Sequence, residues 1–594
     1  MNRLMIFHHY DVDDLVDDHI VYQLQAYRDF GIKILFVSNS SLPLRETAKI
    51  AHLVDTCLLR RNEGFDFGAW KELILDKGPR FFSSFDELIL TNCTCYGPVF
   101  PLCEMFDKMD SQTCDYWMLT NHSTALGFPA HGQSYFIVLK KTILSSTTFW
   151  SFWKYLPPLS LIDDAIWLGE IRFARTLATA GFEGAAYYDA SRDVPDYELG
   201  HVEPYCMNSA DILMTKGRVP LIKIKAVAEW FSRSYSIAPM IFNALSQAKS
   251  DYPQKLIINH LRRTQSVSCQ RFLPESIAIC PEGVQSDVQK ARIAYLVAFE
   301  GLNTASFDLG EITYSGDLLV LVQNETMVLE LEKLIRKEYP CFGYTEICVR
   351  PQPSDNGFPL LSTFYERLDR YEHVVLLRNF EKKLRSDALV ARVNLMKTRL
   401  SLTLNSMVSS SVALLEEEQG LGLVISSLPS VYVLSNDFSK SLDVNVVNFL
   451  RTHGIVFQKE SHVPVLVSPA CPCIVRASIL KRLANSVTGK KSEIGVTEDQ
   501  VLDMLPYIAQ AFGYYSKESI TQSDLLMNVH LYQDFICSVQ FNNKIIHYNR
   551  LFFQEMCSRL VKVLQGYLFC RFPGISRART RFRCARKGIP FSGV

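Results

Sequence analysis

The stretch from Asn62 to Trp70 combines side chains that can bind a polar ligand with glycines that permit tight turns. Gly64 and Gly68 stand four positions apart, with Asn62 and Asp66 beside them, between a short apolar run and a helix-like segment. Glycine allows positive φ and close backbone approach, and a helix start offers free N–H groups to an anion. The same residues also fit a structural glycine turn capped by Asp66 or Asn62.

Polar residues follow three other apolar runs in the same way. The apolar runs predict strands over residues 4–7, 34–37, 57–59 and 88–90, and amphipathic or acidic-start helices alternate with them. This alternation predicts a mostly parallel sheet covered by helices on both faces, in which ligands bind beyond the carboxyl ends of the strands. The polar residues expected at that edge, and to bind the ligand there, are His9, Tyr10, Asp11, Ser38, Asn39, Asn62, Gly64, Asp66, Gly68, Asn92 and Thr94.

These segments resemble the rhamnan synthesis protein F family from Met1 to about Lys225. The motifs that carry the resemblance are His9-Tyr10-Asp11 with Asp17-Asp18, Val37-Ser38-Asn39-Ser40, Asn62 to Lys71, Cys95-Tyr96-Gly97-Pro98, Phe100-Pro101-Leu102 with Glu104-Met105-Phe106, Gln133-Ser134-Tyr135-Phe136, Phe152-Trp153, and Pro220 to Lys225. The resemblance implies a glycosyltransferase of GT-A-like fold. It implies a nucleotide-sugar donor, dTDP-rhamnose in the best-known members, and a growing cell-surface polysaccharide or lipid-linked glycan as acceptor.

One departure concerns a metal ion. The family has Asn-Asp-Ser where this chain has Asn92-Cys93-Thr94, and GT-A enzymes hold a metal with an Asp-x-Asp motif at that strand end. Mg²⁺ and Mn²⁺ need hard oxygen ligands, so the thiol of Cys93 argues against either ion. The diphosphate is then held by helix starts and by basic groups such as Arg60, Arg61 or Lys71, or catalysis has been lost.

Glycosyl transfer with inversion needs a carboxylate that deprotonates the acceptor hydroxyl. The segment from Leu161 to Ile171 contains three, of which Glu170 aligns with a recurrent Glu of the family and Asp164 is its competitor. A solvated acidic helix face fits the segment equally well. We expect His122 and His131 to be loop histidines, and the aromatic run Phe149, Trp150, Phe152, Trp153 and Tyr155 to pack in the core.

The length and composition describe a multidomain globular chain whose net charge does not favour a strongly charged partner. Its 594 residues exceed what one core accommodates, and its 62 basic and 62 acidic residues cancel, which gives no reason to expect nucleic-acid binding. The 16 cysteines lack zinc-site spacing and are expected to be reduced. The short apolar start and the lack of an 18-residue apolar run predict a cytoplasmic protein without a membrane span.

We expect four parts: a donor-binding α/β domain over residues 1–226, a helical linker over 227–275, a second, degenerate α/β domain of similar architecture over 276–535, and a tail over 536–594. Strands are expected near 276–280, 318–322, 345–349, 374–377 and 423–425, with a strand-to-helix step at Cys473 to Leu480. Residues Pro353 to Phe358 retain part of an Asn-x-Gly-x-Asp turn, and Lys382, Lys383 and Arg385 follow the next strand.

The tail combines an amphipathic run with basic residues. Its bases are Arg571, Arg577, Arg579, Arg581, Arg583, Arg586 and Lys587, and no acidic residue follows Glu555. Such a segment can lie on an anionic membrane or remain solvated. The sequence thus favours a rhamnosyl-type glycosyltransferase, at the inner membrane face if the tail binds lipid. A catalytically inactive scaffold and a glycan-binding protein remain as alternatives.

Overall fold

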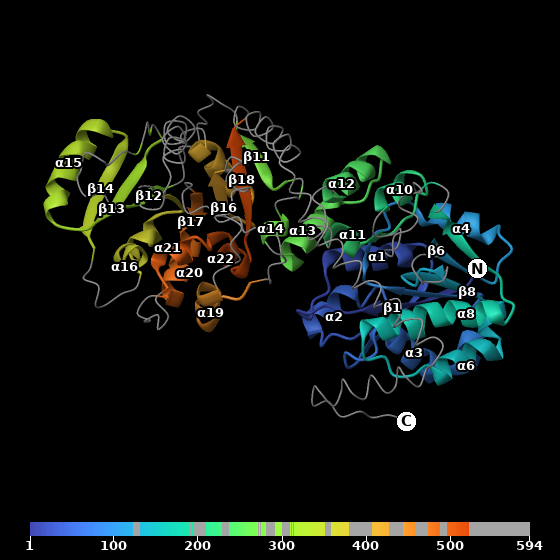
Figure 1. Ribbon diagram of the computed structural model, residues 1–594. Coiled ribbons are helices and arrows are strands. Elements are labelled where there is room, and N and C mark those ends of the chain that lie inside the picture. The colour runs from blue at the N-terminus through green and yellow to red at the C-terminus, as the bar shows by residue number, and fades with distance from the viewer. Residues whose placement is uncertain are drawn as a thin grey trace, which may run out of the picture. The chain divides into compact units, whose positions relative to one another are not determined.

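The structure is a computed structural model with two compact units (Figure 1). The first runs to His260 and the second starts at Leu261. The structure describes residues 1–122, 131–190, 193, 209–228, 237–265, 267–270, 273, 275–280, 292–299, 309, 312, 314–350, 358–378, 407–426, 444–457, 473–487 and 496–521.

The first unit begins with four parallel strands in the order β3-β2-β1-β4. They are β1 (Arg3–His9), β2 (Lys33–Ser38), β3 (Thr56–Leu59) and β4 (Glu87–Asn92), and the helices α1 (Asp18–Asp29), α2 (Leu44–Ile50) and α3 (Phe65–Phe82) connect them. All residues of β1 and β4 are buried, because helices cover both faces of the sheet. The predicted parallel arrangement is confirmed.

The sheet continues with strands of mixed direction. After β5 (Cys95–Tyr96) and α4 (Leu102–Asp110) come β6 (Tyr116–His122), β7 (His131–Gly132) and β8 (Phe136–Lys140). Strand β8 is antiparallel to both β4 and β6, while β9 (Gly184–Tyr188) runs parallel to β6. A separate two-stranded sheet pairs β10 (Ile222–Lys223) with β5, so residues more than a hundred positions apart meet.

Alternating residues of the strands face two apolar layers. Met5 and Phe7 pack against α1, α2 and α4, whereas Leu4 and Ile6 pack against α3, α6 (Thr147–Tyr155) and α8 (Arg172–Thr179) (Figure 1). Helix α5 (Lys141–Leu144) precedes α6, and α7 (Ile162–Asp164) and the π-helix η1 (Ala165–Ile171) lie between α6 and α8 in the chain. The expected packing role is confirmed for Phe149, Phe152 and Trp153, but Tyr155 is 65% exposed.

Short helices follow the first sheet. They are α10 (Ala210–Thr215), α11 (Ile224–Ala228), α12 (Ile237–Gln247), α13 (Gln254–Thr264) and α14 (Val267–Gln270). The boundary between the two units falls inside α13.

The second unit repeats the strand order of the first. Its strands are β11 (Ile277–Cys280), β12 (Ile293–Ala298), β13 (Gly316–Val322), β14 (Phe342–Val349), β15 (His373–Arg378), β16 (Leu421–Ser426), β17 (Cys473–Arg476) and β18 (Tyr515–Thr521). The order β14-β13-β12-β15-β17-β16-β18 matches β3-β2-β1-β4-β8-β6-β9, and in both orders the fifth strand is antiparallel to the strands on either side. In the first sheet β7 also pairs antiparallel with β6. Strand β11 is added beside β18. The predicted second α/β sheet of similar architecture is confirmed.

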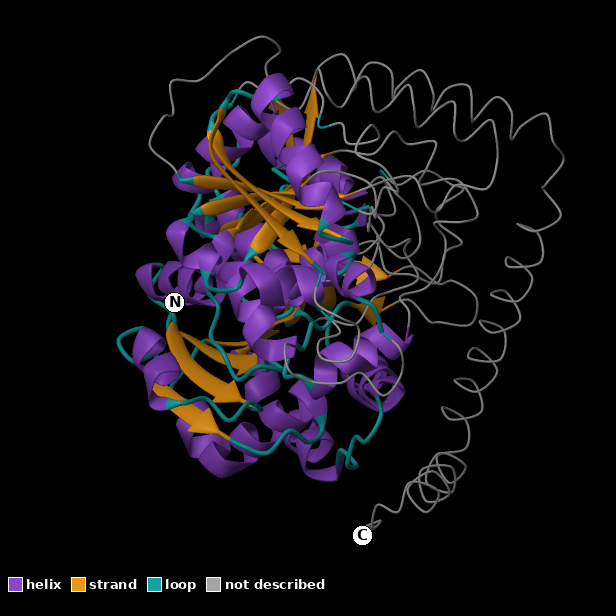
Figure 2. Ribbon diagram, turned by 90° about the vertical axis from the view of Figure 1, so that its left-hand side faces the viewer, coloured by secondary structure: helices purple, strands orange, loops and turns teal. Residues whose placement is uncertain are grey.

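Helices cover both faces of this sheet too, as Figure 2 shows with strands in orange and helices in purple. One face carries α16 (Pro359–Phe364), the 3-10 helix η5 (Arg367–Arg370), α19 (Val444–Thr452), α20 (Ala477–Val487), α21 (Glu498–Leu502) and α22 (Leu505–Ala511), and the other carries α15 (Thr326–Glu338) and helical residues 407–417. The Glu498 carboxylate accepts hydrogen bonds of 2.9 and 2.8 Å from the backbone N–H groups of Leu360 and Leu361. Burial raises the pKa of Glu498 to about 7.

Several sequence features lie outside the described residues. They are residues 353–357 of the partial turn motif, Lys382, Lys383, Arg385 and the whole tail from residue 536. Within the described ranges, every helix is too short or too polar to cross a bilayer.

The edge of the first sheet opposite its carboxyl ends is held by Arg3. Its guanidinium lies 2.7 Å from Glu87 on the neighbouring strand and 2.7 Å from Asp110 at the end of α4, and it covers the ring of Phe106 at 4.3 Å. The Glu87 side chain is 1% exposed, so removal of Arg3 would leave a buried carboxylate without its cation.

We therefore expect Arg3→Leu to lower the free energy of unfolding by about 3 kcal/mol, because breaking a buried ion pair costs far more than breaking an exposed one. The matched control is Arg45→Leu, whose side chain is 78% exposed and lies 3.6 Å from Glu46; it should change stability by about 0.5 kcal/mol or less. Urea unfolding of the full chain measures both. Equal losses in the two variants would show that Arg3 has no special role.

Candidate functional site

The carboxyl ends of the four parallel strands lie side by side. In register, His9 of β1 faces Ser38 of β2, Ser38 faces Leu59 of β3, and His8 faces Asn92 of β4. The loops that follow these strands therefore leave the sheet at one edge, and this edge brings the predicted polar groups together.

Two hydrogen-bonded pairs of residues join the loop after β1 to the loop after β2. His9 Nδ1 lies 3.0 Å from Ser38 Oγ, and Ser40 Oγ accepts a 2.7 Å hydrogen bond from the Asp11 N–H. His9, Ser38 and Ser40 are buried, while Asp11 is half-buried and Tyr10 is 44% exposed. The buried groups thus orient the loops, and Tyr10 and Asp11 are the members of this part that a ligand can reach.

Arg60 fixes the next loop. Its guanidinium donates to Asn39 Oδ1 at 2.7 Å, to the Glu63 carbonyl at 2.8 Å and to the Glu72 carboxylate at 2.6 Å. Asn39 in turn donates to Asn62 Oδ1 at 3.3 Å. With these three acceptors, Arg60 shapes the loop that carries Asn62 towards α3.

The other two proposed diphosphate cations differ in position. Arg61 is exposed. Lys71 donates to the Leu156 carbonyl at 2.6 Å and so ties α3 to the loop after α6, and burial lowers its pKa.

The two glycines shape the start of α3. Gly64 is the N-cap residue with φ of +75°, and the Gly68 N–H donates to its carbonyl at 2.7 Å. A Cβ on Gly64 would approach Gly68 Cα to 3.1 Å, and a Cβ on Gly68 would approach the Glu63 carbonyl oxygen to 3.1 Å. The positive φ of Gly64 favours glycine there, and at both positions a Cβ would crowd the backbone of the turn that presents Asp66.

Asp66 lies at the centre of the edge. Its Oδ2 accepts a 2.9 Å hydrogen bond from Asn92 Nδ2, and its Oδ1 accepts one of 2.8 Å from the Phe67 N–H. Asn92 Oδ1 accepts hydrogen bonds from Thr94, whose hydroxyl accepts one of 2.8 Å from Lys223 Nζ. Burial raises the pKa of Asp66, although the Asn92 hydrogen bond and the charge of Lys223 oppose the rise.

Glu170 lies in the π-helix η1, and its carboxylate is hydrogen-bonded by residues of the segment before β8. Ser134 Oγ donates to it at 2.6 Å, Gln133 Nε2 donates at 3.1 Å, and His131 Nε2 lies 3.2 Å from its Oε1. Burial favours the neutral acid, but His131, Ser134 and the charge of Lys223 outweigh burial and hold the pKa of Glu170 below its ordinary value. Glu170 is therefore an anion at neutral pH.

Lys223 links the two carboxylates. Its charge lowers the pKa of both Asp66 and Glu170, whereas the charge of Glu170 raises the pKa of Asp66. The Lys223 ammonium also lies 5.0 Å from the centre of the Tyr135 ring. Asp66, Glu170 and Lys223 thus form one charged cluster, which includes a lysine to which the sequence analysis gave no role.

Asp164 has a different environment. Its Oδ2 accepts hydrogen bonds of 3.2 and 3.0 Å from the N–H groups of Ser160 and Leu161, at the start of α7. These contacts cap a helix start. His122 ends β6, and its side chain lies outside the described residues.

The donor atoms at the edge do not fit Mg²⁺ or Mn²⁺. Burial raises the pKa of Cys93 to about 12, and its thiol exchanges hydrogen bonds of 3.3 and 3.5 Å with the backbone of Tyr10. A protonated thiol is a poor ligand, and the oxygens of Asp66 and Asn92 already accept hydrogen bonds. The ammonium of Lys223, 2.8 Å from the Thr94 hydroxyl, adds a positive charge beside these oxygens.

Three residues of the site, Gln133, Ser134 and Lys223, belong to sequence motifs although the sequence alone assigned them no role. Gln133 and Ser134 belong to a motif that carries the family resemblance, and Lys223 belongs to the last one. Their roles were not evident because partners come from segments distant in sequence. Lys223 reaches Thr94 only through the pairing of β10 with β5.

Three solved structures resemble the chain weakly. They are HddC from Yersinia pseudotuberculosis (13% identity, 24% of this chain, 79% of that chain, TM-score 0.17), a putative nucleotide-diphospho-sugar transferase from Desulfovibrio desulfuricans (14%, 42%, 99%, 0.21) and the glycosyltransferase GlyE of Streptococcus pneumoniae (11%, 67%, 89%, 0.25).

Sequence comparison gives a curated relative and a family. The chain is 22% identical over 186 residues, 31% of its length, to the uncharacterized protein y4gN of Sinorhizobium fredii, and the match spans 48% of that relative. The family model described as rhamnan synthesis protein F matches residues 34–455, most of the chain. The chain thus belongs to the rhamnan synthesis protein F family.

Proposed function

We propose that the chain transfers a sugar, rhamnose, from a nucleotide-sugar donor such as dTDP-rhamnose to a growing cell-surface polysaccharide or lipid-linked glycan. The observation that carries this proposal is the cluster of Asp66, Glu170 and Lys223 at the carboxyl edge of the first sheet. An anionic base and a cation at one ligand-binding edge are what transfer from a diphosphate donor requires.

Each member of the cluster has a distinct task. Glu170 accepts the proton of the acceptor hydroxyl as its oxygen attacks the anomeric carbon of the donor sugar. The bond from that carbon to the diphosphate oxygen breaks, and the ammonium of Lys223 and the N–H groups at the start of α3 stabilise the charge left on the diphosphate. Asp66, fixed by Asn92, positions the donor. No divalent ion is needed, because Lys223 supplies the positive charge.

Cys93 favours a second candidate, a catalytically inactive scaffold. A protonated thiol stands at the strand end where the family has a carboxylate, and a chain that kept its donor contacts could bind the nucleotide without turnover. This scaffold binds nucleotide but transfers no sugar, and that is how measurement separates it from the enzyme.

We expect Lys223→Ala to weaken dTDP binding about tenfold or more, because a charge-assisted contact to the diphosphate is lost. Binding of thymidine, which has no diphosphate, should not change. The matched control is Lys225→Ala, an exposed lysine two positions away, which should bind dTDP as the wild type does. Isothermal titration calorimetry measures all three proteins. Identical dTDP affinities in Lys223→Ala and the wild type would exclude the proposed role of Lys223.

We expect Glu170→Gln to reduce turnover of dTDP-rhamnose by roughly a hundredfold to ten-thousandfold, the usual effect of losing a general base, without weaker dTDP binding. Because its pKa is held low, Glu170 stays ionised as pH falls to mildly acidic values, so the acid limb of kcat/KM should lie below the ordinary range of glutamate. Ser134→Ala should move that limb to higher pH.

Asp164→Asn is the control for Glu170→Gln. It keeps an acceptor oxygen at the helix start and should leave turnover close to wild type. Full activity of Glu170→Gln, or loss of turnover in Asp164→Asn alone, would assign the base elsewhere. Nucleotide binding with no turnover by the wild type, for any nucleotide sugar tested, would support the scaffold.

We further propose that the basic tail brings the enzyme to an anionic membrane, where a lipid-linked acceptor lies. Each basic residue near such a surface contributes about 1 kcal/mol to the free energy of membrane binding. The full chain should float with liposomes containing phosphatidylglycerol, and a chain ending at residue 547 should not. Equal flotation of both would remove this part of the proposal.

A further inference from the structure

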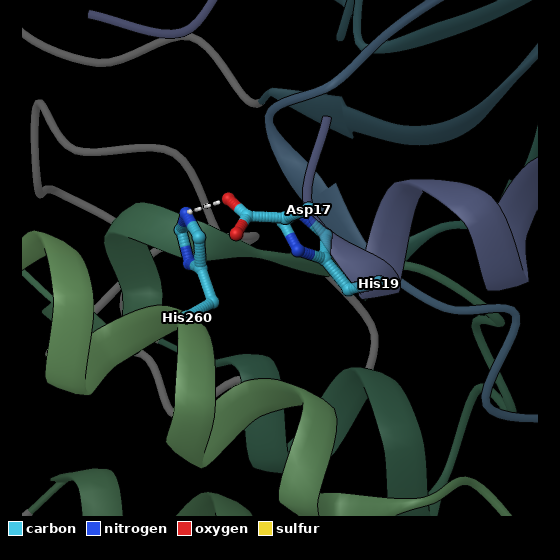
Figure 3. Close-up of side chains that lie close together, drawn as sticks. All are labelled: Asp17, His19 and His260. Carbon is cyan, nitrogen blue, oxygen red and sulfur yellow. Dashed lines mark ion pairs between the residues drawn. The ribbon is translucent and has the colours of Figure 1, made fainter. Parts of the chain in front are cut away.

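A second group of residues that could bind a ligand lies in the first unit. The inference drawn from it is independent of the proposed function. Asp17 is the N-cap residue of α1, His19 lies in the first turn of that helix, and His260 comes from α13, more than two hundred positions later. One ligand atom from each of the three lies within 4.8 Å of the others. Figure 3 shows the carboxylate and the two imidazole rings gathered between the two helices.

The spacing of these groups suits coordination to one ion. His260 Nε2 lies 3.6 Å from Asp17 Oδ2, longer than a normal hydrogen bond. Two ligands at about 2.1 Å from a tetrahedral Zn²⁺ are about 3.4 Å apart. The rings of His19 and His260 have centres 4.5 Å apart and are tilted by 57°, so they are not stacked face to face and their nitrogens can converge.

Tyr96 of β5 orients one of the imidazoles. Its hydroxyl lies 2.7 Å from His260 Nδ1, and its ring packs edge-on against His19 with centres 5.2 Å apart. In the tautomer whose Nδ1–H donates to Tyr96, the lone pair of His260 is on Nε2, which faces Asp17. Metal-binding histidines use such a second hydrogen bond to fix the ring and its tautomer.

The surroundings are those of a protected site. His19 is 3% exposed and His260 is 9% exposed, and the Asp17 side chain is 20% exposed. The positive end of the α1 dipole disfavours a cation, but Asp17 and the neighbouring Asp18 place two negative charges there. Two imidazoles and one carboxylate are borderline ligands that favour Zn²⁺ over Mg²⁺ or Ca²⁺, which prefer oxygen alone.

We propose that Asp17, His19 and His260 bind a Zn²⁺ ion, with water completing the coordination. The ion fastens α13 to the start of α1, two elements that the chain connects only through a long intervening segment, and the Tyr96–His260 hydrogen bond joins β5 to the same site. Because Zn²⁺ needs a deprotonated carboxylate and neutral imidazoles, binding weakens as pH falls.

The test is a Zn²⁺ titration of the full chain after removal of bound metal by a chelator. A chromophoric competitor reports the affinity, and a phosphine reductant keeps the 16 cysteines reduced. We expect one tight site in the wild type that is absent in His19→Gln and His260→Gln. Tyr96→Phe, which removes only the orienting hydrogen bond, should weaken the site roughly tenfold. Equal numbers of tight sites in the wild type and His260→Gln would overturn the proposal.

A matched pair of aspartate variants guards against loss of folding. Asp17 is the N-cap residue of α1, but its side chain makes no capping hydrogen bond there. Asp17→Asn therefore leaves the helix start intact, since asparagine is an equally good N-cap residue, and removes the ligand charge. It should weaken Zn²⁺ binding about a hundredfold, while Asp18→Asn, which removes a nearby charge but no ligand atom, should weaken it much less. Circular dichroism verifies that both variants are folded. A folded Asp17→Asn variant with wild-type affinity would exclude Asp17 as a ligand and overturn the site.

Cobalt substitution identifies the ligands directly. Co²⁺ bound by imidazole and carboxylate gives visible d–d bands without the near-ultraviolet charge-transfer band of a cobalt–thiolate bond. We expect the wild type to show the d–d bands alone, and His260→Gln to lose them. A thiolate band at one equivalent of Co²⁺ would assign the metal to cysteines instead and overturn the proposal.

Discussion

The positive charge of Lys223 is the interaction on which the candidate site depends. Partial burial disfavours ionisation of both Asp66 and Glu170, and the charge of Glu170 further disfavours ionisation of Asp66. A cation that acts on both allows two carboxylates to share one edge. The lysine is delivered by a strand of two residues, so the short β5–β10 sheet determines the electrostatics of the edge.

Much of the architecture could be predicted because buried parallel strands are continuous apolar runs. Residues 4–7, 34–37 and 88–90 correspond to β1, β2 and β4, and their register places the polar groups at one edge. Two strands of the second unit, β12 and β18, were missed. The sequence of β18 is Tyr515-Ser-Lys-Glu-Ser-Ile-Thr, which has too many polar residues to give the apolar pattern of a buried strand. Its pairing with β11 and β16 stabilises it as a strand.

The site was less predictable than the fold, since its contacts join distant segments. The Asp66–Asn92 hydrogen bond crosses from a helix start to a strand end, and the Glu170 contacts cross from a π-helix to the segment before β8. No local pattern encodes such contacts; Glu170 was singled out by family resemblance and Lys223 was not. The capping contacts of Asp164 likewise depend on the exact turn at Ser160 and Leu161.

The side chain of Glu498 makes the two similar units differ at one helix start. Helix α16 of the second unit corresponds to α3 of the first, since α3 connects β3 to β4 and α16 lies between the matching strands β14 and β15. At α16 the Glu498 carboxyl group already accepts hydrogen bonds from two backbone N–H groups, so an incoming phosphate would have to displace it. The second copy is in this respect self-liganded. In the first copy Asp66 accepts from one N–H group at the start of α3, and the nucleotide binding that we propose for the first unit has no counterpart at α16.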